Sequence, residues 1–327
     1  MNRSSFLRAL ALAAGVLALG PFARAQDAGY PSKPIRVVIP SAPGGGTDFI
    51  SRLLSTKLGE STGWTFVPDN RAGAAGTLGL AEVARLKPDG HDLVVGQTAN
   101  VSLAPWLMKL GFDPAKDLQP IALVVEAPMV LLVNASSPFT SWADLVKAAK
   151  AAPGKPLSYA TSGIGSVAQV AGETIQAASG FKLQHVPYKG SAPAIADLVG
   201  GHVDIAGTSL ASALPHVNGG KVRALAITSE RRSASLPDVP TLAELGYAKF
   251  HIVEWYGVFA PAGLSPAIAD RLNAEINKVL QRPDVRQQIQ AQGQEPRPEC
   301  RQAFAAMVKA DNLASREVIA KAGIKLE

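Results

Sequence analysis

The stretch IRVVIPSAPGGGTDFISRLLSTKL, residues 35–58, passes from a strand pattern through a glycine-rich turn into a helix pattern. Residues 35–39 form a short, mostly β-branched run, which is typical of a buried strand. From Asp48 to Leu58 the apolar residues recur at helical spacing instead. The three glycines between the two segments allow a sharp turn. The stretch is therefore a β-then-α unit.

Such units recur along the chain, which predicts an α/β fold with parallel sheets covered by helices. We expect two lobes, one built from residues 26–126 and 251–327 and the other from residues 127–250. The chain would cross between the lobes twice, and two crossings make a hinge. The predicted strands are 35–39, 64–67, 93–95, 121–126, 130–133, 157–159, 183–188, 203–205, 224–228 and 250–259, and the predicted helices are 48–58, 78–86, 142–151, 166–178, 192–199, 266–281, 285–292 and 300–322.

The first 25 residues have the pattern of a secretory signal peptide. Arg3 and Arg8 precede a short apolar run, and Ala23-Arg24-Ala25 is a small-x-small cleavage site. The apolar run is shorter than the ~20 residues that a spanning helix needs, although a membrane anchor is the alternative interpretation. We expect cleavage after Ala25 and a periplasmic mature protein.

Composition limits the classes of function. Removal of the three arginines of the signal lowers the formal net charge from +6 to +3, and the remaining basic residues are scattered. This distribution does not indicate nucleic-acid binding. The single cysteine, Cys300, rules out an intrachain disulfide and a cysteine-based metal site. We expect Cys300 to pack within the C-terminal helix.

Two turns are candidate ligand sites, because each lies between a predicted strand and a predicted helix. Residues 43–48 (PGGGTD) and residues 161–166 (TSGIGS) combine glycines with hydroxyl side chains. A helix N-terminus carries partial positive charge and unpaired N–H donors, so it binds anions. An ordinary tight turn would use the same residues. Because the turns belong to different predicted lobes, they can grip one carboxylate from opposite sides.

Other features have simpler structural interpretations. Residues 70–77 (NRAGAAGT) precede a helix, and we expect Arg71 to be a surface or lobe-packing residue. Asp48 and Arg52 are four residues apart, which predicts an ion pair on one helix face. His251 and Glu254 are three apart in a predicted strand and should face opposite sides. Neither a metal-binding histidine motif nor a G-x-S-x-G nucleophile elbow occurs in the sequence.

An ordered set of short motifs spans almost the whole mature chain. It includes the glycine turn at 43–48, Pro88-Asp89-Gly90, the turn at 162–166, Val186-Pro187-Tyr188-Lys189-Gly190, Leu236-Pro237-Asp238-Val239-Pro240-Thr241 and Ala260-Pro261-Ala262-Gly263. With these motifs the sequence resembles the substrate-binding proteins of the tripartite tricarboxylate transporter family, the Bordetella uptake gene (Bug) receptors.

The resemblance implies a two-lobed periplasmic-binding-protein fold of type II-like architecture, with a small carboxylate bound in the cleft between the lobes. It implies membrane permease subunits of a tripartite tricarboxylate transporter as partners, a monomer, and no cofactor, metal or catalytic residue. Ser41 departs from the family, where an aromatic residue is common, and Gly207-Thr208-Ser209 lacks larger residues, which suggests a roomier or more polar pocket. The predicted ligand-binding residues are Ser41, Ala42, Gly44, Gly45, Gly46, Thr47, Asp48, Gln97, Thr98, Ser162, Gly163, Gly165, Ser166, Tyr188, Thr208 and Ser209.

Two other functions stay open at this point. An exported ligand sensor would bind the same ligand for a signalling partner. An exported enzyme on the same scaffold would need an acid–base pair in the cleft, and the motifs above contain none.

Overall fold

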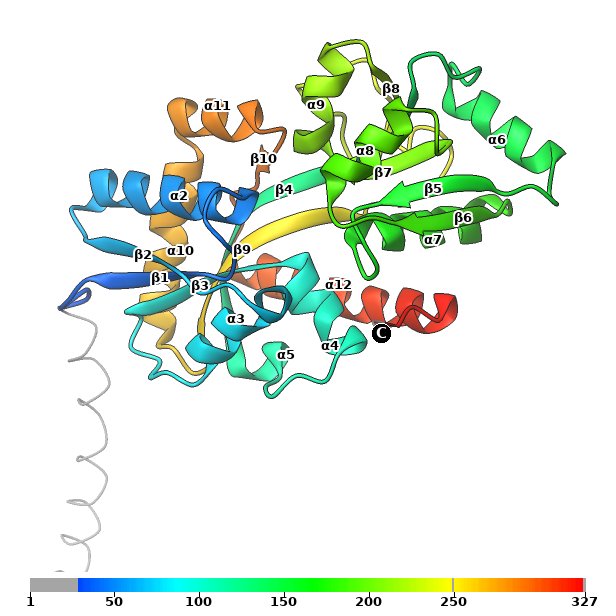
Figure 1. Cartoon of the computed structure of the whole chain (residues 1–327). Helices are drawn as coiled ribbons and strands as arrows, with labels where there is room; N and C mark the ends of the chain where they lie inside the picture. The colour runs from blue at the N-terminus through cyan, green and yellow to red at the C-terminus, as the bar shows by residue number, and fades with distance from the viewer. Residues whose placement is uncertain (1–28, 249, 326–327) are drawn as a thin grey trace, which may run out of the picture.

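The computed structural model describes residues 29–248 and 250–325 (Figure 1). The predicted signal peptide lies outside these residues. Within them, no helix is long and apolar enough to cross a membrane.

The strands form two connected groups that share one long strand, β4 (Figure 1). The first group has the order β2-β1-β3-β9-β4, with β10 also paired to β4, and the second group has β4-β7-β5-β6, with β8 paired to β4. The bounds are β1 Ile35–Ile39, β2 Phe66–Asn70, β3 Asp92–Gln97, β4 Leu118–Asn134, β5 Leu157–Thr161, β6 Leu183–Pro187, β7 Ile205–Ser209, β8 Val222–Ile227, β9 Val253–Pro261 and β10 Glu295–Pro296.

Helices cover both faces of each group and give each lobe its own apolar cores. In the first lobe, α2 and α10 pack on one side and α3 and α12 on the other; in the second lobe, α6 and α7 pack opposite α8 and α9. The bounds are α2 Gly46–Thr62, α3 Thr77–Ala84, α4 Ala104–Leu107, α5 Pro114–Asp117, α6 Trp142–Ala151, α7 Val167–Ser179, α8 Ser191–Val199, α9 Leu210–Asn218, α10 Pro266–Leu280, α11 Pro283–Ala291 and α12 Arg301–Ala322, with short helical turns η1 Ala74–Gly76 and η2 Ala99–Leu103.

Local sequence signals account for several helix ends. Ser141 caps α6 through a reciprocal capping box with Asp144, because its hydroxyl accepts from the Asp144 N–H while the Asp144 carboxylate accepts from the Ser141 N–H. Gly180 ends α7 in the left-handed conformation, where glycine carries no steric cost. Both ends were predicted from the sequence.

The structure corrects four expectations. The two strands predicted at 121–126 and 130–133 are one continuous strand, β4, because its residues are buried along nearly the whole length and pair on both edges. Helix α9 was not predicted. The strand predicted at 203–205 lies later, at Ile205–Ser209. Cys300 is exposed at the N-cap of α12, so it is not a packing residue.

Two strands connect the lobes, and they run side by side in Figure 1. β4 pairs with β9 from Leu118 to Pro128 and then with β7 and β8 from Met129 onward. Helix α12 also reaches the second lobe, where it packs against α7. The exact lobe boundaries at residues 126 and 250 stay a prediction, and the first of them falls inside β4.

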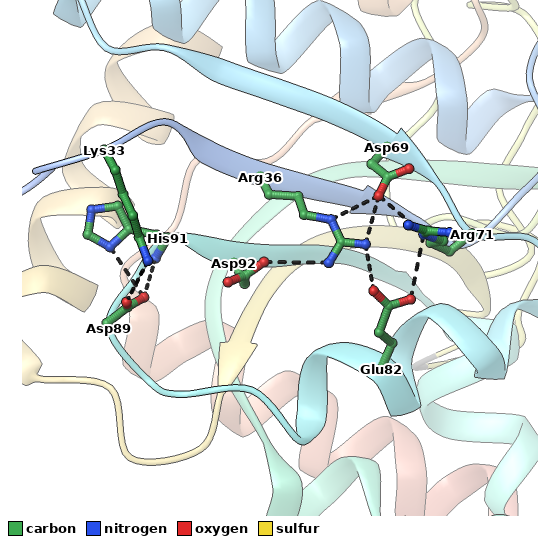
Figure 2. A network of polar contacts seen from close by, with 8 residues as sticks. All are labelled: Lys33, Arg36, Asp69, Arg71, Glu82, Asp89, His91 and Asp92. Atoms are coloured by element: carbon green, nitrogen blue, oxygen red, sulfur yellow. Dashed lines mark hydrogen bonds and ion pairs between the residues drawn. The ribbon is translucent and has the colours of Figure 1, made fainter.

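A network of charged side chains holds the first lobe together at one surface (Figure 2). The Arg36 guanidinium on β1 lies 2.7 Å from the Asp69 carboxylate on β2 and 3.6 Å from that of Asp92 on β3, and it also binds Glu82 on α3. Arg71 joins the same network through Asp69, at 3.2 Å. Arg71 is therefore an exposed residue that pairs within the first lobe, in agreement with the predicted surface position.

Candidate ligand-binding site

The turn between β1 and α2 is exposed to solvent, and hydrogen bonds to a buried side chain hold its shape. Residues 42–46 are exposed, whereas Thr47 and Asp48 are buried. The Asp48 carboxylate accepts hydrogen bonds from the Gly44 N–H (3.0 Å), the Asn70 amide (2.9 Å) and the Arg52 guanidinium (2.9 Å). Burial opposes ionisation of Asp48, but these hydrogen bonds hold its pKa below the ordinary value. Asp48 therefore shapes the turn, and its oxygens are occupied by protein donors.

The helix begins earlier than predicted, so Thr47 lies inside it. Gly45 is the N-cap and Thr47 lies in the first turn of α2, so Thr47 is not the cap. Its hydroxyl donates to Gln97 Oε1 at 2.8 Å. The N–H groups at the start of a helix have no acceptor within the helix. Here the exposed N–H groups of this kind belong to Gly45, the N-cap, and to Gly46. The donors that this turn offers to a ligand are thus backbone groups.

The second turn is built in the same way. The Gly165 N–H donates to Gln169 Oε1 at 2.8 Å, just as the Gly44 N–H donates to Asp48, and in both turns the acceptor is four residues further on. Ser166 is the N-cap of α7, and its hydroxyl accepts from the Gln169 N–H at 3.2 Å. Ser162 and Gly163 are partly exposed. Because Gly165 is occupied, fewer amides of this turn are available than the sequence suggested.

The segment that follows β3 lies between the two turns. Gln97 accepts the Thr47 hydroxyl from the first turn. A few residues later, Leu103 packs in one apolar cluster with Val167, the first residue of α7 after the second turn. Residues 97–103 therefore contact the helices that follow both turns, one in each lobe.

Other predicted ligand contacts are occupied or buried within the protein. The Thr98 hydroxyl accepts from the Trp255 N–H at 2.8 Å and is buried. The Tyr188 hydroxyl donates to Asp197 at 2.6 Å, and this hydrogen bond raises the pKa of Tyr188 to about 12. Thr208 is buried at the end of β7, and Ser209 caps α9. The polar groups of these side chains are thus engaged within the protein or buried, and their contact with a ligand stays a prediction.

The space expected beside Gly207 is also absent. A Cβ atom on Gly207 would lie 2.0 Å from the Tyr159 hydroxyl oxygen. Tyr159 thus fills the room that a larger residue at position 207 would take. Gly207 therefore adds no space to a pocket, and the alternative of a more polar pocket stays a prediction.

The sequence analysis missed three polar residues around the first turn. The Tyr256 hydroxyl oxygen lies 3.3 Å from the point where a Cβ atom of Gly46 would stand, and it hydrogen-bonds with Glu254. Burial raises the pKa of Glu254, against the opposing effect of the Tyr256 hydroxyl. Gln294 lies beside the same glycine, and its buried Oε1 has no hydrogen-bond partner among the residues that the structure describes. No local motif marks these residues, because they come from β9 and from the loop before β10.

The Ser41 hydroxyl is another buried oxygen without a partner at this turn. The Ser41 carbonyl accepts from the Asn70 amide at 3.0 Å, which fixes the start of the turn. Among the described residues, no group of three or more histidine, cysteine or acidic side chains is placed to hold a metal ion. The site is therefore a set of exposed backbone donors surrounded by neutral polar side chains and two carboxyl groups, those of Asp48 and Glu254.

Comparison with known proteins identifies the family. The model of the tripartite tricarboxylate transporter family receptors matches residues 50–324. The chain belongs to this receptor family. Protein BugT of Bordetella pertussis is 38% identical over 273 residues, which cover 82% of each chain.

Two solved structures of similar proteins share the fold of this receptor family member. The periplasmic binding protein BugD is 34% identical, with a TM-score of 0.71, over 91% of this chain and 100% of that one. MatC of Rhodopseudomonas palustris, solved with bound malate, is 33% identical, with a TM-score of 0.70, over 89% of this chain and 100% of the other. The two-lobed periplasmic-binding-protein fold predicted from the sequence is thereby confirmed, and the family is one of solute-binding receptors.

Proposed function

We propose that the chain is a periplasmic solute-binding protein that captures a small carboxylate and delivers it to the membrane permease subunits of a tripartite tricarboxylate transporter. The observation that carries the proposal is the exposed turn at Gly44–Gly46, where the Gly44 N–H donates to Asp48 and the N–H groups of Gly45 and Gly46 lie at the N-terminus of the 17-residue helix α2. A helix N-terminus with free N–H groups favours a negative ligand group. The malate bound to MatC is a ligand of this chemical class.

Two features support a binding role at a hinge. The turns at 43–48 and 161–166 come from different lobes, and both adjoin the helices that contact residues 97–103. The lobes are joined by β4 and β9, which allow one lobe to rotate against the other. The N-terminal pattern of a signal peptide agrees with a periplasmic location.

A thermal-shift screen of purified, ligand-free protein tests the proposal. Small di- and tricarboxylates, acidic amino acids and aromatic acids form the panel. A ligand at 100 times its Kd stabilises the native state by about 2.7 kcal/mol, which gives a clear rise in Tm. The bound ligand should be recovered unchanged after prolonged incubation.

A matched pair of variants tests whether the ligand binds at this turn. Gly45→Val should abolish the shift, because its side chain would cover the amides of the turn. Gly154→Val is the control, since Gly154 also lies in an exposed turn with open space around it, and it should bind as wild type. If no carboxylate of the panel shifts the Tm of wild type, the proposed function is wrong. If Gly45→Val still binds, the ligand lies elsewhere.

A further inference from the structure

The carboxyl group of Glu254 lies next to the turn that we assign to the ligand carboxylate. Glu254 and Tyr256 are both on β9 and, being two residues apart, point to the same face of the sheet. Trp255, between them, points to the opposite face and donates to Asp311 of α12. The face that carries Glu254 is therefore the face of α2.

Tyr256 connects Glu254 to the start of α2. Its hydroxyl hydrogen-bonds with the Glu254 carboxyl, and it stands 3.3 Å from the Cβ position of Gly46. The Tyr256 hydroxyl thus links the Glu254 carboxyl to Gly46 of the turn. A ligand held by its carboxylate at the turn would bring its next few atoms beside Glu254.

Within the described residues, no lysine, arginine or histidine forms an ion pair with Glu254. The nearest charged clusters use other acids: Arg52 pairs with Asp48, and Arg297 and His251 pair with Glu126. Tyr256 accounts for one hydrogen bond to Glu254. Each oxygen of a carboxyl group has acceptor capacity for more than one donor. Glu254 is mostly buried but keeps partial exposure, and a contact with it requires that a bound molecule reach its remaining acceptor sites.

We propose that Glu254 determines the ligand class: it accepts a hydrogen bond from an ammonium or hydroxyl group that lies near the ligand carboxylate, so the receptor selects amino acids or hydroxy acids over plain carboxylic acids. This inference rests on the proposed function, because it assumes that a carboxylate binds at the turn. A second carboxylate next to Glu254 would be repelled, whereas a donor would be attracted. Burial raises the pKa of Glu254, and a bound ammonium group would favour its ionised form again.

Calorimetric titration with matched ligand triplets tests the inference. Each triplet has one carbon skeleton and differs only at carbon 2, which carries hydrogen, hydroxyl or ammonium. Suitable sets are succinate, malate and aspartate; glutarate, 2-hydroxyglutarate and glutamate; and 3-phenylpropanoate, 3-phenyllactate and phenylalanine. For the skeleton that wild type binds, the hydroxyl or ammonium member should bind at least about tenfold more tightly than the plain acid.

Variants of Glu254 should remove this preference selectively. Glu254→Ala should bring the members of a triplet to within about threefold of one another. Glu254→Gln keeps an acceptor but no negative charge, so it should lose the ammonium preference first. Glu317→Gln, on the exposed surface of α12, is the matched charge control and should behave as wild type. Far-UV circular dichroism and Tm confirm that each variant is folded.

The outcomes separate the two proposals. If wild type binds none of the triplets or any other carboxylate, the proposed function fails. If it binds a carboxylate but treats the three members of the triplet alike, the role of Glu254 is refuted and the receptor function stands. A preference that survives unchanged in Glu254→Ala also refutes the role of Glu254.

Discussion

Replacing Arg297 with methionine should destabilise the chain more than replacing its partner, Glu126, with glutamine. Glu126 lies on β4 close to the crossing between the lobes, and its side chain is only 5% exposed. Its two oxygens lie 3.1 Å from Arg297 Nη1 and 3.4 Å from His251 Nε2. The cluster therefore joins both chain crossings to the segment that follows β10.

The expected losses of stability in the two variants differ because Glu126 and Arg297 are buried to different extents. Arg297→Met leaves the Glu126 carboxylate buried with His251 alone, which should cost about 3 kcal/mol, the lower end of the range for breaking a buried pair. The lower end applies because Arg297 is itself 33% exposed. In Glu126→Gln, Arg297 keeps Glu299 at 2.9 Å and its contact with water. This variant should lose only about 1 kcal/mol.

Urea unfolding followed by circular dichroism and tryptophan fluorescence measures both values. Arg282→Met is the control, because Arg282 forms exposed pairs with Glu60 and Asp284, and it should cost less than about 1 kcal/mol. If Glu126→Gln destabilises the chain as much as Arg297→Met, the burial argument is refuted.

The pH dependence of the stability gives a second test of the same cluster. The hydrogen bond to Glu126 raises the pKa of His251 above its ordinary value of 6.5, against the effect of burial. A raised pKa means that protonation of His251 stabilises the native state; this stabilisation is complete below pH 6.5 and is lost as pH rises through the raised pKa. Because His251 is 34% exposed, the effect is small, below about 1 kcal/mol. It should disappear in Glu126→Gln.

Three further variants test the packing and the two turns. Gly257→Ala should cost about 1–3 kcal/mol in urea unfolding, because its Cβ would lie 2.2 Å from the buried Phe304 ring, whereas Gly154→Ala, in open space, should change stability little. Asp48→Asn should lower stability by about 1–2 kcal/mol at pH 7, and the difference should vanish as pH falls through the lowered pKa of Asp48; a constant difference down to pH 2 would contradict this. Ser162→Ala should weaken carboxylate binding by about 1–2 kcal/mol in calorimetry at unchanged Tm, and unaltered affinity would remove Ser162 from the site.

Much of the fold follows from local patterns in the sequence. The apolar run at residues 35–39, the glycine turn and the helix after it were all placed correctly to within a few residues. The ion pair between Asp48 and Arg52 was predicted from their spacing and is present at 2.9 Å. These features depend on neighbours along the chain, so a single sequence contains the information needed to predict them.

The roles of the hydroxyl groups in the turns could not be predicted in this way. Thr47 was predicted to bind the ligand, but its hydroxyl donates to Gln97, 50 residues away. Thr98 was expected in the site and instead binds the backbone of β9. A hydroxyl binds whichever acceptor or donor the tertiary fold brings within 3 Å or so, and sequence spacing does not specify that partner.

The sequence by itself determined the β-then-α units, both glycine turns and, through its ordered motifs, the receptor family. Only the tertiary structure decided that β4 runs unbroken from one lobe to the other, and that Glu254 and Tyr256 stand beside a turn some 200 residues earlier in the chain. The physical reason is the range of the forces involved. Periodicity and capping act between residues a few positions apart, whereas strand pairing and burial join distant segments and set which polar groups meet at the ligand site.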